Sequence, residues 1–413
     1  MSQATRILLS LVVGLAAGIA AAELAPDHAL RATEVTQRIG GAWLHGLQMT
    51  IVPLIIALLV TGIGATAEAA RAGRITFRAV AMMVAVLWAT TSMAALVMPL
   101  ILRAFPLPGA LAASLRHALA GTRPLGAAPG IGAFFDRIVP TNVVAAASND
   151  EFLPLTIFSL VFAFAVIRLP DDKRTVITGF FQALVEAMLL VINWILLLAP
   201  IGVFMLAYGV GARTGTAAFG ALVHYIACVS AVGAIVVASG YLVGAVGGRV
   251  SLARFARAVL PAQAVAVSTE SSLACLPAML KASAELGAPA ATAGIVLPLA
   301  VAIFRATSPA MNLAVSLYIA SWLGIPIGPG QMVAGVATAA VTTMGSVSLP
   351  GTVSFFASIA PVALVMGIPI EALGLLIAVE TIPDLFRTVG NVTMDVATTI
   401  TVAARSRADE VAV

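Results

Sequence analysis

The chain has 413 residues, of which 61% are hydrophobic and 10% are charged, and its mean hydropathy is +1.07. A soluble domain carries about 25% charged residues, so this composition excludes a soluble protein. The apolar runs are long rather than alternating, which predicts membrane-spanning helices. The net charge of +4 requires no nucleic-acid partner, because basic loops on one face of a membrane explain it.

The chain begins MSQATRILLSLVVGLAAGIAAAELAP, in which Arg6 precedes an apolar run that ends in small residues. A cleaved signal peptide has the same pattern. We favour an uncleaved first span, because the rest of the chain is also predicted to lie in the membrane. Eight apolar spans are expected, at about 5–25, 40–64, 76–102, 150–169, 177–210, 219–247, 289–322 and 366–402.

Basic residues gather after every second span, and such ends are typically cytoplasmic. They are Arg71, Arg74 and Arg78 after the second span, Arg168, Lys173 and Arg174 after the fourth, Arg249, Arg254 and Arg257 after the sixth, and Arg405 and Arg407 after the last. The uncharged loop 322–330 and the longer stretch 103–149, rich in Gly, Pro and Ala, are expected on the external side. The chain is therefore predicted to be a multi-pass protein of the cell inner membrane, with both termini cytoplasmic.

Two further apolar segments, 266–287 and 340–361, are too interrupted to be spans. Each has a Ser-rich centre followed by Leu-Pro, and a proline removes a backbone donor and clashes with the preceding turn. Because unsatisfied backbone cannot face lipid, each segment is predicted to form a re-entrant helical hairpin with a buried tip. The two segments look like an internal repeat, and broken helices at matching places in two halves indicate a transport site near the midplane.

The segment TIPDLFRTVGNVTMDVATT, which begins at Thr381, places costly polar groups inside an apolar span. On a helix, five polar side chains fall within about 80° of one face. They are Glu380, Asp384, Arg387, Asn391 and Asp395. An ionisable group at the membrane centre costs about 2.5–3.5 kcal/mol on insertion scales. This stripe is therefore predicted to face the protein interior, where its groups are paired or solvated.

Two interpretations of the stripe are open. Asp384 can bind an ammonium group, Arg387 can hold a carboxylate through two hydrogen bonds, and Asn391 offers both a donor and an acceptor. Together they complement an acidic amino acid. Alternatively, Asp384 and Arg387 form a structural ion pair across one helical turn. The length of the stripe and the two broken hairpins favour the binding site.

The chain resembles the dicarboxylate/amino acid:cation symporter family, the glutamate and aspartate transporters, over nearly its whole length. MTIVPLIIALLVTGI, IVPTNVVAAASNDEFLPLTIFSLVFAFAV and INWILLLAPIGVFMLAYGV are similar to the family's second, fourth and fifth helices. SSLACLP and SLPGT resemble the tips of its two hairpins. DLFRTVGNVTMD matches the Asp-x-x-Arg-Thr-x-x-Asn-x-x-x-Asp pattern of the last helix, which is the most specific of these matches.

The resemblance implies a homotrimer of elevator type with eight transmembrane helices, two re-entrant hairpins and inverted repeats. A static scaffold would contain 1–75, with helices 1 and 2, and 104–215, with the external loop and helices 4 and 5. A mobile transport domain would contain helix 3 at 76–103 and the whole of 216–413. The latter range would hold helix 6, hairpin 1 at about 251–284, helix 7, hairpin 2 at about 330–365, and helix 8.

The resemblance also implies roles for single residues. Asp384 would bind the amino group of the substrate, Arg387 its side-chain carboxylate, and Asn391 its α-carboxylate. Further substrate contacts are implied for Thr388, for Ser271 and Ser272 of hairpin 1, and for Ser308, which stands where the family has a threonine. The external gate would consist of Gly345, Ser346, Ser348, Pro350 and Gly351.

This sequence departs from the family where sodium is bound. The family's helix 7 carries Asn-Met-Asp-Gly-Thr, whereas this chain has FRATS at 304–308, so Phe304 and Ala306 replace two oxygen ligands and Arg305 replaces the methionine. On helix 3 the usual tyrosine is Trp88. Thr91 and Ser92 remain there, and Asn391 and Asp395 keep part of a further sodium site.

We interpret these changes as loss of sodium coupling. Arg305 would act as a tethered cation, and Glu270, which replaces an arginine of the archaeal members, would neutralise it. Glu270, Glu380 and Asp395 are then candidate proton carriers, because burial disfavours the charged form of a carboxyl group. The plainer alternative for Glu270 is a structural ion pair with Arg305 or Arg387.

The predicted function is a sodium-independent secondary active transporter of aspartate or glutamate, for which the proton is the candidate coupling ion and uncoupled exchange is the alternative. The alternatives are a sodium-coupled symporter of acidic amino acids or C4-dicarboxylates, and an anion-conducting member of the family. An enzyme is not expected, because the sequence shows no activated nucleophile, metal set or phosphate loop. No cofactor, metal centre or disulfide is expected. The expected partners are the acidic amino acid, protons, the lipid bilayer and two further copies of the chain.

Overall fold

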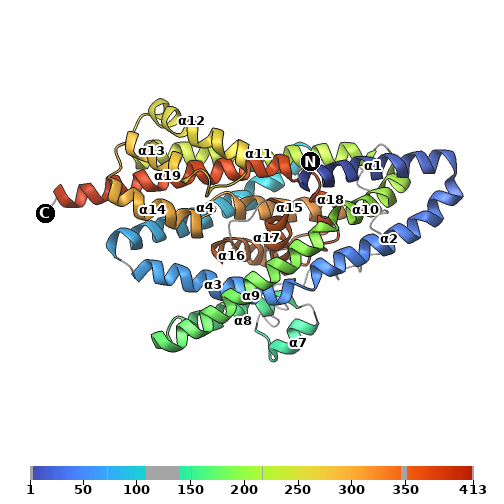
Figure 1. Ribbon diagram of the computed structural model, residues 1–413, viewed down its shortest axis with the longest axis horizontal. Helices are drawn as coiled ribbons and strands as arrows, with labels where there is room; N and C mark the ends of the chain where they lie inside the picture. Colours follow the sequence, from blue (N-terminus) through green and yellow to red (C-terminus); the bar gives the residue numbers. More distant parts are fainter. Residues whose placement is uncertain are drawn as a thin grey trace.

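The computed structural model describes residues 3–71, 73–107, 139–149, 151–215, 217–345 and 351–411. Every regular element in these ranges is a helix (Figure 1), which confirms the expected all-α class. Six helical stretches of the described residues are long and apolar enough to cross a membrane. They are Thr5–Leu24, Arg31–Ala70, Arg74–Ala104, Asp171–Leu197, Phe219–Gly247 and Ala290–Leu323. The chain is therefore a multi-pass membrane protein.

One group of helices comes from the first half of the chain. α1 packs against α10, α10 packs against α2, and α3 packs against both α8 and α9. This group, which we call the first group, occupies the right-hand and lower parts of Figure 1. Its helices are α1 (Gln3–Leu24), α2 (Pro26–Gln48), α3 (Ile51–Arg71), α7 (Val143–Ser148), α8 (Phe152–Val166), α9 (Asp171–Leu197) and α10 (Ala199–Thr214).

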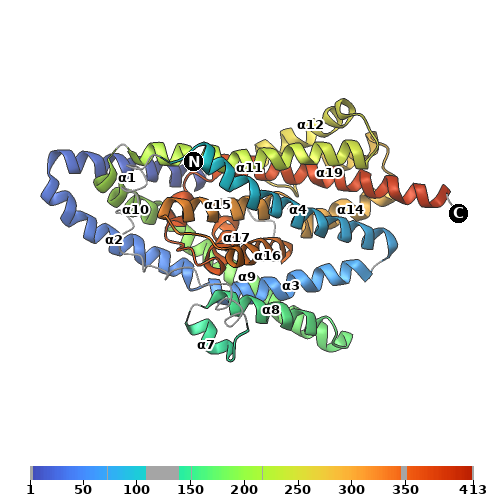
Figure 2. The ribbon, with the colours of Figure 1, turned by 180° about the vertical axis from the view of Figure 1, so that it is seen from behind.

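The second group joins α4 to the helices of the second half of the chain. α11 lies along α19, α15 packs against α4, and α12 and α14 also pack against α19, as Figures 1 and 2 show from opposite sides. Its helices are α4 (Arg74–Ala104), α11 (Ala217–Gly247), α12 (Leu252–Thr269), α13 (Leu276–Glu285), α14 (Ala290–Ile303), α15 (Ser308–Leu323), α16 (Pro329–Gly345), α17 (Gly351–Val365), α18 (Leu373–Leu376) and α19 (Thr381–Val411).

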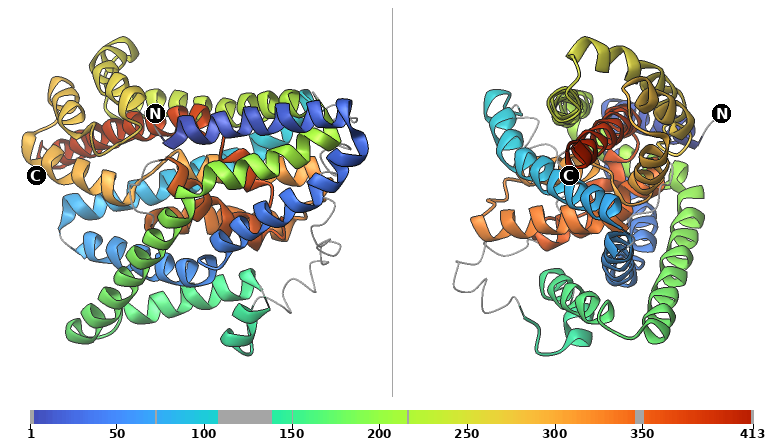
Figure 3. Two further views of the ribbon diagram at one scale, coloured as in Figure 1. Left: turned by 45° about the vertical axis from the view of Figure 1, so that its right-hand side comes forward. Right: turned by 90° about the vertical axis from the view of Figure 1, so that its left-hand side faces the viewer.

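The two interrupted segments form helical hairpins. The first pairs α12 with α13 over 252–285, and the second pairs α16 with α17 over 329–365. The sequence pattern had indicated only 266–287 and 340–361, so each hairpin begins more than ten residues earlier than that pattern predicts. Figure 3 shows the first hairpin projecting from the end of the bundle at which α19 terminates. The chain reverses at 270–275 in this hairpin, and Glu270 adopts a left-handed conformation there with φ of 50°.

Four of the expected spans are interrupted. The span 40–64 breaks at 49–50, between α2 and α3. The span 177–210 breaks at Leu198, where α9 ends and α10 begins with a proline in its first turn. The span 289–322 breaks at 304–307, between α14 and α15. The expected helix 366–402 begins only at Thr381, because the chain before it forms α18 and successive tight turns with hydrogen bonds between residues three apart.

A close approach of two helices holds part of the first group together. Gly14 and Gly18 lie on α1 with the small-xxx-small spacing that lets membrane helices pack backbone to backbone. A Cβ at Gly14 would lie 2.6 Å from the carbonyl oxygen of Phe204, and one at Gly18 would overlap that of Tyr208. Because neither neighbour is a movable side chain, the α1–α10 contact excludes larger residues here.

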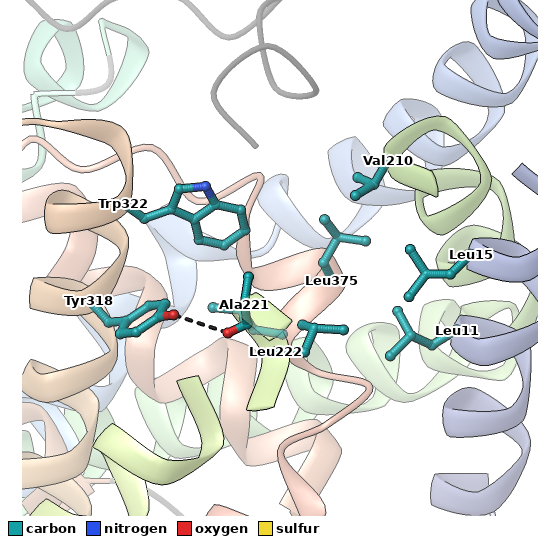
Figure 4. A pocket seen from close by; sticks show the side chains of 9 residues that line it. Leu11, Leu15, Val210, Ala221, Leu222, Tyr318, Trp322 and Leu375 are labelled. Atoms are coloured by element: carbon teal, nitrogen blue, oxygen red, sulfur yellow. Dashed lines mark hydrogen bonds between the residues drawn. The ribbon is translucent and has the colours of Figure 1, made fainter. Parts of the chain in front are cut away.

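One part of the boundary between the two groups of helices is lined mainly by apolar side chains. Figure 4 shows a small cavity at this boundary, where Leu11 of α1 and Val210 of α10 approach Leu222 of α11. The Tyr318 hydroxyl at its edge donates a hydrogen bond to the Ala221 carbonyl at 3.1 Å, so this polar group is satisfied within the second group. No polar side chain therefore links the two groups across this cavity.

We expect Gly18→Ala to destabilise the protein. Overpacking of a tight contact costs about 1–3 kcal/mol, which exceeds the gain of about 1 kcal/mol from replacing a helical glycine by alanine. Gly41→Ala on α2 is the matched control, because nothing lies within 4 Å of its Cβ. The melting temperature in detergent should fall for Gly18→Ala and stay equal or rise for Gly41→Ala. Equal melting temperatures for both variants would contradict the close approach of α1 and α10.

Candidate functional site

The polar stripe of the last helix is buried, as its sequence predicts. Glu380 is 1% exposed, Asp384 4%, Arg387 6%, Asn391 5% and Asp395 0%. Four of them lie on α19 and Glu380 directly precedes it, and α19 packs mainly against α11, α12 and α14 of the second group. Because polar groups are costly in the interior of a membrane protein, this part of α19 is the candidate functional site.

Arg387 is the centre of a network of ion pairs. Its Nη2 donates to Glu380 Oε1 at 2.7 Å, and its Nη1 donates to Asp384 Oδ1 at 3.2 Å. Its Nε is buried and has no hydrogen-bond partner among the described residues. Two carboxylates therefore bind the Nη atoms of the guanidinium group, and its Nε–H remains available as a hydrogen-bond donor.

Tyr225 of α11 supplies a further contact to this network. It is fully buried, and its hydroxyl donates to Glu380 Oε2 at 2.8 Å. Both oxygens of Glu380 therefore receive a hydrogen bond, one from Arg387 and one from Tyr225, which favours the ionised carboxylate. The sequence analysis did not identify Tyr225, although a single tyrosine within an apolar span usually has a hydrogen-bond partner when it is buried.

The break between α14 and α15 lies against α19. Asn391 Oδ1 accepts a hydrogen bond from the backbone N–H of Thr307 at 2.9 Å. The backbone carbonyl of Ala306 accepts one from the Thr90 hydroxyl of α4 at 2.8 Å. These two contacts satisfy backbone groups that the unwound residues 304–307 would otherwise leave unpaired inside the membrane. Thr90 was also missed, because the sequence analysis considered only its neighbours Thr91 and Ser92.

Gly390 makes this contact possible. A Cβ at Gly390 would overlap the Thr307 side chain, so only glycine lets α19 approach the broken segment so closely. The hydroxyls of Thr307 and Ser308 are buried and have no hydrogen-bond partner among the described residues. The break therefore places two hydroxyl groups without hydrogen-bond partners among the described residues next to Asn391.

Arg305 lies within this break. It is half-buried and within electrostatic range of Asp384, Arg387 and Asp395. Within the described residues it forms no ion pair shorter than 4.0 Å. Its side chain thus places a positive charge beside Phe304 and Ala306, the two positions at which the family's oxygen ligands are missing.

Asp395 is the most isolated charged group of the site. Both of its carboxylate oxygens are fully buried and lack a hydrogen-bond partner among the described residues. The Thr398 hydroxyl, one turn further along α19, is also unpaired. A buried carboxylate without a partner is costly, so this position favours either a bound cation or a proton.

The tip of hairpin 1 lies close to the site, but no hydrogen bond joins the two among the described residues. The expected burial of this tip is wrong for Leu273, which is 58% exposed. Glu270 is half-buried and within electrostatic range of Asp384, while it forms no ion pair with Arg305 or Arg387 among the described residues. Ser271 and Ser272 are half-buried, and the Ser271 hydroxyl accepts a hydrogen bond from the backbone N–H of Ala274, in its own turn, at 3.4 Å. The expected roles of these residues stay predictions.

The other expected site residues are divided between buried and exposed positions. Thr388 is 5% exposed on α19, and Thr91 is fully buried, where its hydroxyl donates to the Leu87 carbonyl at 2.6 Å. Ser92 is exposed on the surface of α4. Gly345 ends α16 and Gly351 begins α17. Three residues of the expected gate, Ser346, Ser348 and Pro350, lie outside the described residues.

The chain is similar to known transport proteins over most of its length. The model of the sodium:dicarboxylate symporter family matches residues 4–405. The chain is 26% identical to the proton/glutamate-aspartate symporter of Escherichia coli (strain K12) over 401 residues, which are 95% of this chain and 90% of that protein. It is 24% identical to the proton/sodium-glutamate symport protein of Bacillus subtilis (strain 168), over 94% of this chain and 89% of that protein. It is 28% identical to C4-dicarboxylate transport protein 3 of Bradyrhizobium diazoefficiens, over 84% of this chain and 76% of that protein.

We expect Gly390→Ala to displace the broken segment from α19. The added methyl group would push against Thr307 and lengthen the hydrogen bond from its N–H to Asn391, which would leave two buried polar groups unpaired. Such a group costs about 1–3 kcal/mol. A fall in melting temperature, together with loss of thermal stabilisation by added aspartate or glutamate, would support this arrangement. Gly294→Ala on α14 is the control, because its Cβ has nothing within 4 Å, and an equal effect in both variants would contradict the close contact.

Proposed function

Because the chain belongs to the sodium:dicarboxylate symporter family, we propose that it carries acidic amino acids, aspartate or glutamate, into the cell by proton-coupled symport. Members of this family and the relatives described above are transporters, so the chain is a transporter and not an enzyme. The observation that carries the choice of substrate is the buried pair Asp384 and Arg387 on one face of α19, beside the broken segment 304–307.

An acidic amino acid could replace the contacts that these side chains make with each other. A substrate ammonium group would take the place of Arg387 at the Asp384 carboxylate. A substrate carboxylate would then bind Arg387 through its free Nε and the Nη that Asp384 had occupied, in the bidentate geometry that arginine favours. Glu380 and Tyr225 would hold the guanidinium group in position during this exchange.

The alternative substrate class is a C4-dicarboxylate. One observation favours it, because Asp384 is already paired with Arg387, and a substrate without an ammonium group would need no free carboxylate on the protein. Relatives named as C4-dicarboxylate transport proteins are also among the similar proteins. Against it, a second carboxylate on the substrate would meet the Asp384 charge in a buried site, where like charges repel strongly.

The charge balance of the site supports a positively charged cosubstrate. The three carboxylates Glu380, Asp384 and Asp395 exceed the guanidinium groups of Arg305 and Arg387 by one. An acidic amino acid brings a further negative charge into this interior. Because unbalanced charge is costly there, at least one proton or metal cation should enter with the substrate.

The geometry favours a proton on Asp395 over one on Glu380. Glu380 receives hydrogen bonds from Arg387 and Tyr225, which stabilise its ionised form, whereas Asp395 receives none among the described residues. Sodium is disfavoured, because it needs several oxygen ligands and the amide oxygen of Asn391 is already bonded to Thr307. The positive charge of Arg305 would also repel a metal ion from this region.

The packing supports the division into a scaffold and a transport domain. The first group of helices corresponds to the expected scaffold and the second to the expected transport domain, and their boundary at the cavity of Figure 4 is apolar. Sliding of one group along the other would break few hydrogen bonds there. We propose on this basis an elevator movement, with the first group providing the contacts of a homotrimer.

We expect Arg387→Lys to weaken binding of aspartate and glutamate at least tenfold. Lysine keeps the positive charge but loses the planar fork that can hold a carboxylate through two hydrogen bonds. Calorimetry with aspartate, glutamate and succinate measures the effect, and Arg257→Lys, at an exposed position on α12, is the control. Unchanged aspartate affinity in Arg387→Lys would contradict the assignment. Succinate binding as tight as aspartate binding in the unaltered protein would favour the C4-dicarboxylate alternative.

We expect uptake of aspartate or glutamate into liposomes in sodium-free choline buffer when an inward proton gradient is imposed. The Asp395→Asn variant should accumulate at least tenfold less substrate under this gradient, because its proton site is removed. It should still exchange internal for external substrate, because its substrate site is unchanged. Glu285→Gln, which changes an exposed carboxylate, is the control.

The coupling assignment fails if sodium raises the affinity of the unaltered protein tenfold or more, which corresponds to about 1.4 kcal/mol. It also fails if Asp395→Asn accumulates substrate to the same level as the unaltered protein under the proton gradient. The family-level function does not depend on either result, because uptake of acidic substrate would still be observed.

A further inference from the structure

His224, near the start of α11, is a half-buried titratable residue that the proposed transport mechanism does not use. Its Nε2 lies 2.8 Å from the carbonyl oxygen of Phe105, which directly follows α4. Its Nδ1 lies 3.0 Å from the hydroxyl oxygen of Tyr318 on α15. The imidazole ring therefore connects three helices of the second group, at the end of the bundle at which α4 ends and α11 begins.

The three polar contacts of this cluster require three hydrogens. The Phe105 carbonyl can only accept, so Nε2 of His224 must carry a hydrogen. The Tyr318 hydroxyl donates to the Ala221 carbonyl at 3.1 Å, as Figure 4 shows, so Nδ1 must supply the hydrogen for its own contact with that hydroxyl. A neutral histidine carries one ring hydrogen and a tyrosine carries one hydroxyl hydrogen. A proton on His224 therefore completes the arrangement.

Loss of that proton changes the partner of the Tyr318 hydroxyl. Nε2 keeps its hydrogen, because the carbonyl groups at the end of a helix have no intrahelical donor and Phe105 follows the end of α4. Nδ1 then becomes an acceptor, and the Tyr318 hydroxyl donates to it instead of to Ala221. Ala221 lies within α11, where each carbonyl also accepts an intrahelical hydrogen bond. The contact between Tyr318 and Ala221 is therefore the one that depends on the proton.

No ion pair fixes the protonation state of His224 among the described residues, where none shorter than 4.0 Å includes it. Cys228 Sγ lies against the ring, 3.7 Å from Nε2 and 3.9 Å from Nδ1. α12 meets α11 further along, where Tyr241 donates a hydrogen bond to Gln263. The other charged or titratable groups on the helices packed around this part of α11 are Tyr318 of α15, Arg103 in the exposed last turn of α4, Arg213 of α10, which binds Gln37, and Glu380 before α19, which binds Tyr225.

Tyr318 connects this cluster to the candidate transport site. Its ring packs edge to face against the ring of Tyr225, with 5.2 Å between the centroids and 74° between the planes. The Tyr225 hydroxyl donates to Glu380, whose other oxygen accepts a hydrogen bond from Arg387. Both tyrosines are buried, and closely packed side chains transmit displacements to their neighbours. The residue that changes partner with the His224 proton therefore supports the residue that holds Glu380.

We propose that His224 is a proton-binding residue that positions the Glu380–Arg387 pair through Tyr318 and Tyr225, so that substrate affinity depends on the pH at this end of the bundle. The proposal rests on the proposed function, because Arg387 is its substrate-binding group. The protonated cluster makes all three contacts and holds Tyr318 in place, so it favours binding at low pH. The basic chain ends predict that this end faces the outside, where the proton gradient supplies the acidic side.

The functional test measures aspartate affinity by calorimetry at about pH 5.5 and about pH 8.0, a range in which histidine side chains change charge. His224→Gln removes the titrating group, and Tyr318→Phe removes the hydroxyl but keeps the ring. His45→Gln, at an exposed position on α2, is the matched control. The ratio of the Kd at the higher pH to the Kd at the lower pH should fall at least threefold in both cluster variants and stay unchanged in the control. Adding Asp395→Asn should leave this threefold factor in place, which separates it from the coupling proton.

A second measurement needs no substrate. In protein with 15N-labelled histidine, the ring signals that disappear in Tyr318-intact His224→Gln belong to His224. Both ring nitrogens should carry hydrogen at the lower pH, and Nε2 alone at the higher pH. The same protonation state at both pH values would overturn the proposal, as would a hydrogen on Nδ1 alone at the higher pH.

The outcomes separate this inference from the proposed function. If aspartate and glutamate bind but their pH dependence is unchanged in both cluster variants, the inference alone is overturned. If neither amino acid binds at any pH, the proposed function fails and the inference fails with it. Tyr318→Phe decides the functional test if His224→Gln does not fold.

Discussion

The pairing of Arg387 with Glu380 and Asp384 is the constraint on which the interior of this protein depends. A guanidinium group in the middle of a membrane protein is tolerated only when it is neutralised and hydrogen-bonded. Glu380 supplies the shorter contact, at 2.7 Å, and Tyr225 of α11 fixes the other oxygen of that carboxylate. The network therefore connects the start of α19 to α11 through hydrogen bonds, so the polar stripe also stabilises the packing of these two helices.

The break between α14 and α15 depends on the same helix. Unwound backbone inside a membrane protein needs partners for its N–H and C=O groups, and Asn391 and Thr90 provide them for Thr307 and Ala306. Gly390 allows the close approach that brings Asn391 within reach. One helix face thus carries both the charged network and the support of the broken segment, and this is why the two lie beside each other.

The sequence predicted the features that follow from long patterns. Span positions, the two hairpins and the burial of the stripe all follow from hydropathy, proline placement and the cost of charge in a membrane. The break at Leu198 and the late start of α19 at Thr381 were missed, because apolar turns have the same composition as apolar helices. Tyr225 and Thr90 were missed for a related reason, since neither belongs to a periodic pattern of polar residues. Their partners, Glu380 and the Ala306 carbonyl, become evident only when the helices are packed together.

On the proposed function, the position of Arg305 separates two tasks that a bound metal ion would perform together. A sodium ion both neutralises buried carboxylates and carries energy, because it binds on one side of the membrane and leaves on the other. Arg305 can neutralise Asp384 or Asp395, which lie within its electrostatic range, but it remains attached to the chain and so cannot couple transport to any gradient. The driving ion must then act at a group whose charge can change during the cycle. Asp395 fits this task better than Glu380, because Glu380 is held by two donors while the oxygens of Asp395 receive none among the described residues.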